Sequence, residues 1–345
     1  IKASINNKNI LITGGGGSIG SELTRQIFFL NPSSIIVLDN NEYNLFLINN
    51  ELTKYSEINE KLKSVKTYFY LLDVSNLSLV KKIFNNKKID IIFHAAAYKH
   101  VGLLETNEKF AFKNNVSATF NLAELAYKHK ILKFINISTD KAVKPTNIMG
   151  LTKFFAENII YNISNTLQNE CIFSSVRFGN VINSKGSIIP IFKKQIENGG
   201  PVTVTDKNVT RYFMSIPEAV GLVLETNTFS SNGDVFFLDM GKPIKILDIA
   251  KKMIRLNGLD YTFDQNDKSK ILITFTGLRS GEKLHEDLTY ENNYLKTINK
   301  FIFKDLNKKY LDIDKEKLRL KIDEIQESNS NKVVRNFLNN LNKYN

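Results

Sequence analysis

The chain has a single cysteine, Cys171, among its 345 residues. One cysteine cannot build a disulfide framework within the chain, and its scarcity indicates a reducing compartment. No run of apolar residues reaches the length needed to cross a membrane, and no secretory signal peptide is visible. Because the sequence opens at Ile1 without a methionine, we expect a piece of a longer protein, with any membrane anchor in a segment absent from this chain.

The sequence also lacks a concentrated basic face, although its formal net charge is +12. The lysines are scattered among asparagines, as in "NNKKID" and "INNKN", without interleaved aromatic residues. Nucleic-acid binding requires clustered basic residues, so we expect no nucleic-acid partner. The positive field would suit an anionic small substrate. We expect no metal site, since no cluster of ligands is evident. We leave His94 and His100 out of the site, because a lone histidine is more often packed in the core.

Apolar, β-rich segments alternate with helical patterns through the first half of the chain. We expect strands at 9–13, 34–39, 67–72, 90–96, 133–138 and 172–178, with helices near 18–30, 42–55, 76–86, 105–129 and 149–167. This alternation predicts the α/β class, with a doubly wound, parallel Rossmann sheet. After residue 180 it breaks up at glycines and prolines. We therefore predict a Rossmann domain at 1–180, a smaller substrate-binding region at 181–300 interleaved with it, and a C-terminal helical tail at 301–345.

The segment "ILITGGGGSIGSEL" places a glycine-rich turn directly between a strand and a helix. Thr13, Gly14, Gly17 and Gly20 form the pattern T-G-x-x-G-x-x-G. Glycine is needed there because the backbone turns sharply and approaches a pyrophosphate closely. The phosphates would then lie against the amides at the helix N-terminus, where the dipole favours negative charge. A strand before the turn and a helix after it make this a dinucleotide-binding prediction.

Two aspartates end the next two strands. Asp39 follows Gly20 by nineteen residues, and a carboxylate there would bind both ribose hydroxyls and repel a 2′-phosphate. It therefore predicts NAD as cofactor and disfavours NADP. The alternative for Asp39 is a loop aspartate that caps the next helix. Asp73 could hold the adenine amino group, and capping of the following helix explains it equally well.

With further motifs the sequence resembles the extended short-chain dehydrogenase/reductase superfamily. "HAAAYKHV" at 94–101 and "STDKAVKPTNIMGLTK" at 138–153 carry this resemblance, together with the glycine-rich turn. "RFGNVINSKGSIIPIF", "TRYFM" and "RSGEKLHE" narrow it to bacterial UDP-N-acetylglucosamine 4,6-dehydratases of the long, membrane-tethered type. These include the dehydratase that starts the di-N-acetylbacillosamine pathway of protein glycosylation, and similar capsule and O-antigen enzymes. The resemblance runs from about residue 8 to about residue 292.

The resemblance implies NAD-dependent conversion of UDP-N-acetylglucosamine to a 4-keto-6-deoxy sugar, with retention at C5 and cytoplasmic location at the inner membrane. Such a site in the superfamily has a tyrosine four residues before its lysine, but this chain has Met149, as the long type does. We assign Asp140 as the acid for the 6-hydroxyl and Lys141 as the base for the C5 proton. These roles require Asp140 to be protonated and Lys141 to be neutral for a useful fraction of the time, and burial would shift both pKa values in those directions. Thr139 would take the 4-hydroxyl proton through a water, and Lys153 would bind the nicotinamide ribose. A solvated Asp-Lys pair in a loop is the alternative.

The same resemblance assigns the remaining contacts of the cofactor and the substrate. The further cofactor contacts are Ser18, Ile19, Ala95 and Ala97. The substrate contacts are Lys99 for the sugar, Asn180 for the diphosphate, Arg211 and Arg279 for phosphates, Glu282 for the uridine ribose, and Ser187. Two other functions stay open: a 4-epimerase acting on the same UDP-sugar, and a non-catalytic NAD-binding sensor.

Apolar positions on two helices suggest assembly. In the helices near 105–129 and 149–167 they fall on more than one face, at Phe110, Phe120, Leu125, Phe155 and Ile159. A surface helix normally buries only one stripe, and relatives pair these helices into a four-helix bundle. We therefore expect a homodimer or a larger oligomer built on that contact.

Overall fold

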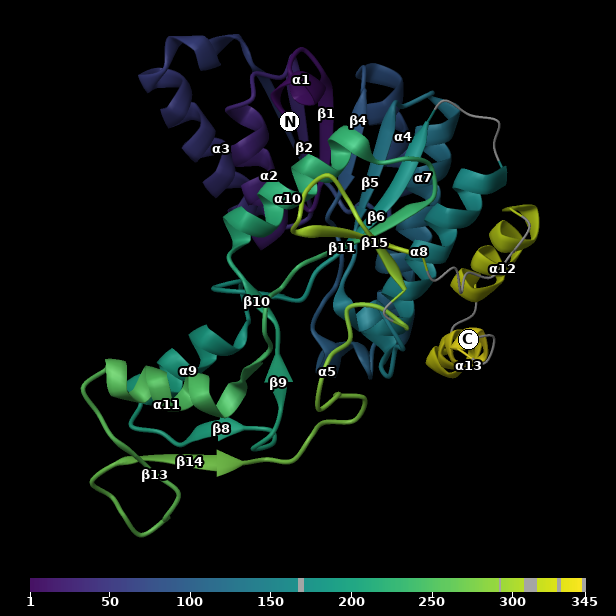
Figure 1. Ribbon diagram of the computed structural model, residues 1–345. Coiled ribbons are helices and arrows are strands. Elements are labelled where there is room, and N and C mark those ends of the chain that lie inside the picture. Colours follow the sequence, from purple (N-terminus) through teal and green to yellow (C-terminus); the bar gives the residue numbers. More distant parts are fainter. Residues whose placement is uncertain (167–170, 292, 307–314, 328–329, 343–345) are drawn as a thin grey trace.

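A nine-stranded sheet forms the centre of the computed structural model, which describes residues 1–166, 171–291, 293–306, 315–327 and 330–342 (Figure 1). The strands lie in the order β15-β16-β11-β6-β5-β4-β1-β2-β3. Their bounds are Asn9–Thr13 (β1), Ser34–Asp39 (β2), Lys66–Leu71 (β3), Ile91–His94 (β4), Lys133–Ile137 (β5), Ile172–Arg177 (β6), Asp234–Leu238 (β11), Tyr294–Lys296 (β15) and Ile302–Asp305 (β16). Strands β3 to β11 along this order are parallel, whereas β16 and β15 are antiparallel additions at one edge.

The six strands predicted from the sequence are all present, and the fold class is confirmed as α/β. The helices between them are Ser18–Phe28 (α2), Glu42–Ile58 (α3), Leu77–Asn86 (α4), Ala118–Lys128 (α7) and Ile148–Thr166 (α8). The helix expected near 105–129 is divided into Val101–Leu104 (α5), Glu108–Phe112 (α6), a π-helical turn at Lys113–Ser117 (η2) and α7. Strand β4 ends at His94, two residues before the predicted end.

Helices cover both faces of the sheet, so its strands are apolar on both sides. Ile10, Leu11 and Ile12 of β1 have no exposed surface. Helices α2 and α3 pack on one face together with Ile216–Phe229 (α10), whereas α4, α7 and α8 pack on the other. The chain runs from β1 through β2 to β3 on one side, then returns to place β4 on the other side of β1. In such sheets ligands bind at the carboxyl ends of the strands, where the strand order reverses.

A smaller lobe, built from the second half of the chain, lies below the sheet in Figure 1. It contains Ile188–Glu197 (α9), Val202–Val204 (β8), Ile246–Leu256 (α11), Tyr261–Thr262 (β13) and Ile271–Phe275 (β14). Phe192, Ile254 and Ile273 are among the buried residues of its own apolar cluster. Two short pairs join it to the sheet: Asn180–Val181 (β7) with Phe213–Met214 (β10), and Thr210–Arg211 (β9) with Ile244–Lys245 (β12).

The second half departs from the expected pattern at two places. The alternation does not stop at residue 180, since α10 and β11 add a further parallel unit beside β6. The expected helical tail from residue 301 begins instead with β16, which pairs with β11. The short segment "FIFKD" has β-branched and aromatic residues but lies among lysines and asparagines that hide the strand pattern. Helices Lys315–Glu327 (α12) and Asn331–Asn342 (α13) follow it.

The C-terminal helices change the interpretation of the apolar positions that suggested a dimer. Phe120, Leu125, Phe155 and Ile159 are all buried within this one chain, and Phe110 alone is exposed, at 63%. Helix α13 packs on α6 and α8, and α12 packs on α8. Residues of α12 and α13, among them Leu318, Ile322, Val334 and Leu338, join the cluster around Phe155. The apolar faces are therefore covered by the chain itself, and they no longer argue for a four-helix bundle between subunits.

No helix in the described ranges has both the length and the apolar character needed to span a membrane.

Truncation of two phenylalanines in this helical layer should lower the stability of the protein by very different amounts. Phe155 stacks on Phe112, with ring centroids 6.3 Å apart, and meets the ring of Phe337 edge-on. We expect Phe155→Ala to lower the free energy of unfolding by about 3–5 kcal/mol, because it leaves a cavity in the core. The exposed Phe110, changed to alanine, is the matched control and should cost less than about 0.5 kcal/mol. Urea unfolding measures both, and equal losses would contradict the packing described here.

Candidate active site

The glycine-rich turn lies between β1 and α2 with geometry that only glycine can adopt at two positions. Gly14 has φ +66°, and a Cβ there would lie 2.7 Å from the Ala96 backbone. A Cβ on Gly20 would lie 2.0 Å from the carbonyl oxygen of Gly14. Helix α2 begins after Gly17 without a side-chain cap, so its first amides, including those of Ser18 and Ile19, have no intrahelical partner. The turn therefore offers free backbone donors to an anion at the topological switch point.

Asp39 lies beside this turn but does not cap the following helix. Its Oδ2 accepts a hydrogen bond from the Gly16 amide at 2.8 Å, and its Oδ1 accepts one from the Asn41 amide at 2.8 Å. The cap of α3 is Asn41, whose side chain accepts from the Asn44 amide. The capping alternative for Asp39 is therefore wrong. Its carboxylate instead fixes the glycine turn against the end of β2.

Asp73 is likewise not a helix cap. Its Oδ1 accepts from the Ser75 amide at 2.8 Å, whereas the side chain of Asn76 caps α4. Asp73 is exposed at the carboxyl edge of the sheet, two strands from β1.

The loop after β4 forms the opposite wall of the turn. The Ala95 amide donates to the Thr13 carbonyl oxygen at 3.1 Å, and Ala97 follows at the same edge of the sheet. His94 has no exposed surface, and its ring nitrogens meet the hydroxyls of Thr13 and Thr119 at 2.7 and 2.9 Å. Burial lowers the pKa of His94 to about 3, so the ring is neutral and structural, as predicted. His100, by contrast, is exposed and is not a core residue.

Thr139, Asp140 and Lys141 lie together just beyond the carboxyl end of β5. The Thr139 hydroxyl caps a single 3-10 turn at Asp140–Ala142 (η3) and donates to Asp140 Oδ1 at 2.8 Å. Lys141 Nζ donates to the same oxygen at 2.9 Å. Asp140 has no exposed surface, and its Oδ2 accepts no hydrogen bond from the described residues. Asp140 is therefore fully buried and Lys141 largely so, with a side chain that is 17% exposed, and the alternative of a solvated loop pair is wrong.

The charge state of Lys141 differs from the expectation. Burial acts to lower its pKa, but the carboxylates of Asp140 and Glu286 outweigh burial, so the pKa is raised. The expected neutral amine is therefore not the resting form. The sequence correctly indicated burial, but it did not reveal that a second carboxylate would lie 3.7 Å from Lys141 Nζ.

Met149 and Lys153 lie on α8, which packs closely on the same turn. A Cβ at Gly150 would lie 2.3 Å from the Lys141 carbonyl oxygen. Met149 is only 4% exposed and belongs to the apolar cluster beneath α8. Lys153 is 5% exposed, and burial lowers its pKa to about 8, with Glu157 acting in the opposite direction. Lys153 is thus a titratable cation close to neutral pH, whereas Met149 is a packing residue.

Of the predicted substrate residues, Asn180 contacts Lys141 directly, and Arg211 and Glu282 pair with each other. Asn180 Oδ1 accepts from Lys141 Nζ at 3.1 Å. Arg211 is 7% exposed and donates to Glu282 Oε1 at 2.9 Å, while its NH1 donates to the Thr210 carbonyl oxygen. Glu282 also accepts from the Thr205 hydroxyl at 3.1 Å. Arg211 and Glu282, assigned to different parts of a substrate, therefore pair with each other in the structure.

The other three substrate residues lie farther from that cluster. Lys99 is exposed in the loop after β4, and Arg279 is exposed after β14. Ser187 precedes α9 without capping it, and its buried hydroxyl has no hydrogen-bond partner within the described segments. The structure gives no direct contact that joins these three to Lys141.

Sequence reasoning missed four charged residues around this turn. Glu286 and Lys283 belong to the motif "RSGEKLHE", but nothing in the sequence indicated that they approach Lys141. Glu157 and Arg177 are fully buried, and the Glu157 carboxylate accepts from Arg177 at 2.6 Å and from the Ser138 hydroxyl. A buried arginine on a strand and a glutamate one turn beyond Lys153 could have suggested this pair.

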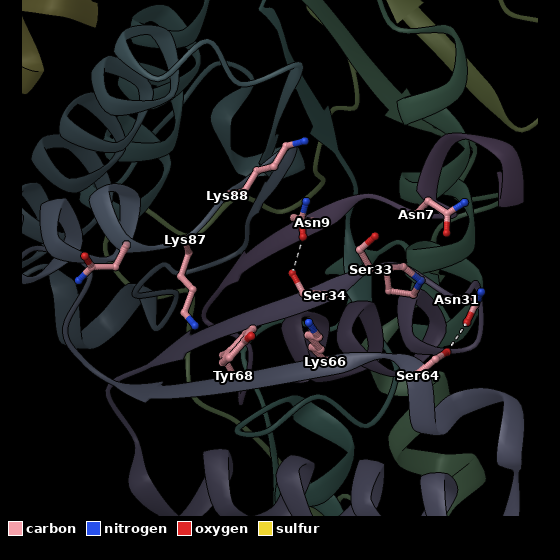
Figure 2. A pocket seen from close by; sticks show the side chains of 12 residues that line it. Asn7, Asn9, Asn31, Ser33, Ser34, Ser64, Lys66, Tyr68, Lys87 and Lys88 are labelled. Atoms are coloured by element: carbon pink, nitrogen blue, oxygen red, sulfur yellow. Dashed lines mark hydrogen bonds between the residues drawn. The ribbon is translucent and has the colours of Figure 1, made fainter.

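A polar hollow of about 500 Å³ lies at the opposite, amino ends of β1, β2 and β3 (Figure 2). Asn9, Ser34 and Lys66 line it, and Figure 2 shows Asn9 hydrogen-bonded to Ser34. None of the predicted site residues is among its lining residues. Among the residues that the structure describes, no group of three His, Cys, Asp or Glu side chains could hold a metal ion.

Comparison with known sequences identifies one matching family. Residues 10–304 match the family described as "Polysaccharide biosynthesis protein". The chain is 46% identical over 292 residues to the capsular polysaccharide biosynthesis protein CapD of Staphylococcus aureus, covering 85% of this chain and 47% of that protein. It is 33% identical to a UDP-glucose 4-epimerase of Rickettsia canadensis, covering 84% and 80% of the two chains. The chain thus spans about half the length of CapD.

Solved structures share the fold. Pen from Bacillus thuringiensis has a TM-score of 0.77 and 29% identity, covering 93% of this chain and 99% of that one. The dTDP-glucose 4,6-dehydratase DesIV of Streptomyces venezuelae, solved with NAD and TYD bound, has a TM-score of 0.66 and 19% identity, covering 82% and 88%. The DesIV likeness shows the same Rossmann fold.

Proposed function

Since the chain belongs to the polysaccharide biosynthesis protein family, we propose that it is an NAD-dependent UDP-N-acetylglucosamine 4,6-dehydratase. The product is UDP-2-acetamido-2,6-dideoxy-hexos-4-ulose. The observation that carries the proposal is the buried Asp140–Lys141 pair, 2.9 Å apart at the carboxyl edge of the sheet. Loss of water from C5 and C6 requires an acid and a base close together. A 4-epimerase on the same sugar requires no such pair.

The glycine turn has the features that a dinucleotide needs. Its cradle excludes any side chain at Gly14 or Gly20, and the amides at the start of α2 face it without a cap. Thr13, Gly14, Gly17, Ser18, Ile19 and Gly20 would hold the pyrophosphate, Asp39 the adenosine ribose, Asp73 the adenine, and Ala95, Ala97 and Lys153 the nicotinamide half. When bound, NAD supplies a hydride acceptor at C4 and returns the hydride to C6. The solved DesIV structure, which carries NAD, supports this choice.

Asp140 and Lys141 divide the proton chemistry between them. Oxidation at C4 makes the C5 proton acidic, and Lys141 takes that proton. Asp140 donates a proton to the departing 6-hydroxyl, which leaves as water. Lys141 then returns its proton to C5 as the hydride reaches C6. The proton is added to the same face of the sugar from which it was removed, so the configuration at C5 is retained. Thr139, whose hydroxyl contacts Asp140, is the proposed route for the 4-hydroxyl proton through a water.

The substrate diphosphate would compete with the Glu282 carboxylate for Arg211. Arg211 now pairs with Glu282, and a phosphate at Arg211 would release Glu282 towards the uridine ribose. Asn180 lies beside Lys141, next to the reacting sugar. The buried hydroxyl of Ser187 has no hydrogen-bond partner among the residues that the structure describes, which suits a phosphate contact. We propose Lys99 and Arg279 for the sugar and a phosphate, with 181–300 as the substrate-binding region.

The wider setting follows from the resemblance. We propose that the product enters bacterial glycan or protein-glycosylation synthesis, including the bacillosamine pathway, at the cytoplasmic face of the inner membrane. We also propose a homo-oligomer, built on a surface other than the helix faces that α12 and α13 cover.

A 4-epimerase is the second candidate, because a UDP-glucose 4-epimerase is 33% identical to this chain. Incubating the purified protein with UDP-N-acetylglucosamine separates the functions. We expect a 4-keto-6-deoxy product by NMR, with no net change in the cofactor because the hydride returns to the sugar. Accumulation of UDP-N-acetylgalactosamine would identify an epimerase, and unchanged substrate would favour a non-catalytic sensor.

The nucleotide released from the denatured protein should be NAD. Asp39 carries a negative charge at the place where a 2′-phosphate would lie, and its position is fixed by the amide of Gly16. We expect NADP to bind at least about tenfold more weakly, as judged by fluorescence titration of nucleotide-free protein. Tight NADP in the purified protein would contradict the prediction.

Asp140 and Met149 should differ in their importance. Asp140→Asn keeps the shape but removes the proton donor, so turnover should fall by about 10²–10⁴-fold. Met149→Ala should retain dehydratase activity and lose mainly stability, because Met149 is a buried packing residue. Lys141→Met should block C5 deprotonation, leaving a reduced-nicotinamide absorbance that does not decay. Full activity of Asp140→Asn, or complete inactivity of a folded Met149→Ala, would refute the assignment.

A further inference from the structure

Glu286 is a buried carboxylate beside the proposed acid–base pair that has no assigned role. Its side chain is 4% exposed, and its Oε1 lies 3.7 Å from Lys141 Nζ and 3.9 Å from Arg211 Nε. Its Oε2 lies 3.9 Å from Lys283 Nζ and accepts no hydrogen bond from the described part of the chain. Burial and the neighbouring Asp140 raise the pKa of Glu286, whereas Lys141, Arg211 and Lys283 act to lower it, so its negative charge depends on the cations around it.

Lys141 therefore lies between two carboxylates, one on each side. Asp140 Oδ1 is at 2.9 Å and Glu286 Oε1 at 3.7 Å. The other charged or titratable groups facing this cluster are Arg211, Tyr212, Lys283 and Asp287. Three cations, Lys141, Arg211 and Lys283, are balanced by the carboxylates of Asp140, Glu282 and Glu286. Removing the charge of Glu286 would leave this buried cluster with one uncompensated positive charge.

In the proposed reaction Asp140 must be protonated and Lys141 must be neutral, whereas in the resting protein the proton is on Lys141. Transfer of one proton from Lys141 to Asp140, across 2.9 Å, would make the acid protonated and the base neutral together. An ionised Glu286 opposes the departure of that proton, because it stabilises the ammonium form of Lys141. The position of the shared proton therefore depends on the charge of Glu286.

From this arrangement, and resting on the dehydratase reaction proposed above, we propose that Glu286 is a positioning residue that holds the resting proton on Lys141. It thereby sets the pH at which the Asp140–Lys141 pair becomes able to react. Glu286 itself acts through Lys141 and contacts neither reacting carbon.

The test is Glu286→Gln, which keeps the shape and removes the charge. Loss of the negative charge of Glu286 lowers the pKa of Lys141, which that charge helps to raise. The limb of the profile of kcat/KM against pH that reports Lys141 should therefore move towards acid, by about one pH unit. Glu286→Asp keeps the charge and should give a profile close to that of the wild type. This comparison separates the effect of the charge from a folding defect in the glutamine variant.

The matched control is Asp287→Asn, the neighbouring carboxylate. Its side chain is 47% exposed and pairs with Lys144 at 3.9 Å, and its charge acts on Tyr212 and Lys283 rather than on Lys141. Its profile should coincide with that of the wild type. A merely structural role for Glu286 would lower stability or kcat without moving either limb, and an unmoved profile in Glu286→Gln overturns the proposal.

A second measurement does not depend on catalysis. The rate at which an amine-acylating reagent modifies Lys141 in nucleotide-sugar-free protein reports its neutral fraction at each pH, by mass spectrometry of the Lys141 peptide. Its midpoint should fall by about one pH unit in Glu286→Gln, and an unchanged midpoint refutes the role of Glu286. If the wild-type protein forms no 4-keto product, the proposed function fails, yet this titration still decides the role of Glu286.

Discussion

The guanidinium of Arg177, which has no exposed surface, joins the parts of the molecule that meet at the site. It binds the Glu157 carboxylate of α8 at 2.6 Å and the Asp305 carboxylate of β16 at 2.5 Å. Glu157 in turn accepts from Ser138, the residue before Thr139. Removing one partner of a buried pair leaves an uncompensated charge and costs about 3–5 kcal/mol. The relative positions of α8, the sheet edge and the turn that holds Thr139, Asp140 and Lys141 therefore depend on this arginine.

Glu157, the partner of Arg177, also affects the pKa of Lys153. Glu157 lies one helical turn after Lys153, and its charge opposes the effect of burial on the Lys153 pKa. The effect of burial on the Lys153 pKa is larger than that of Glu157, whose carboxylate also pairs with Arg177. On the other side of the turn, Glu286 and Asp140 keep Lys141 cationic. The pKa values of these two lysines are therefore shifted in opposite directions, because Lys141 has two carboxylates acting on it and Lys153 has one.

The sequence predicted the first half of the fold well because local signals and tertiary structure agree there. Buried parallel strands are continuous apolar runs, and each is followed by a turn and an amphipathic helix. It also predicted the burial of Asp140 and the place of the glycine turn. It failed where long-range contacts decide: β16 joins the sheet across some sixty residues from β11, and α13 covers Phe155 from the far end of the chain. Glu286 reaches Lys141 in the same way, across a separation that no local pattern records.

The surroundings of Met149 bear on where the proposed proton chemistry would take place. Its side chain packs in the apolar cluster with Phe155 and Ile159, where a phenol hydroxyl would have to find a hydrogen-bond partner or carry a desolvation cost of about 1–3 kcal/mol. A thioether is free of that requirement, but it cannot hold a proton. The ionisable groups near the end of β5 include Asp140, Lys141 and Glu286 on one side and Lys153 on the other. Asp140 and Lys141 are in direct contact, so they can exchange a proton without an intermediary, and in the reaction proposed above their acid and base forms are generated together.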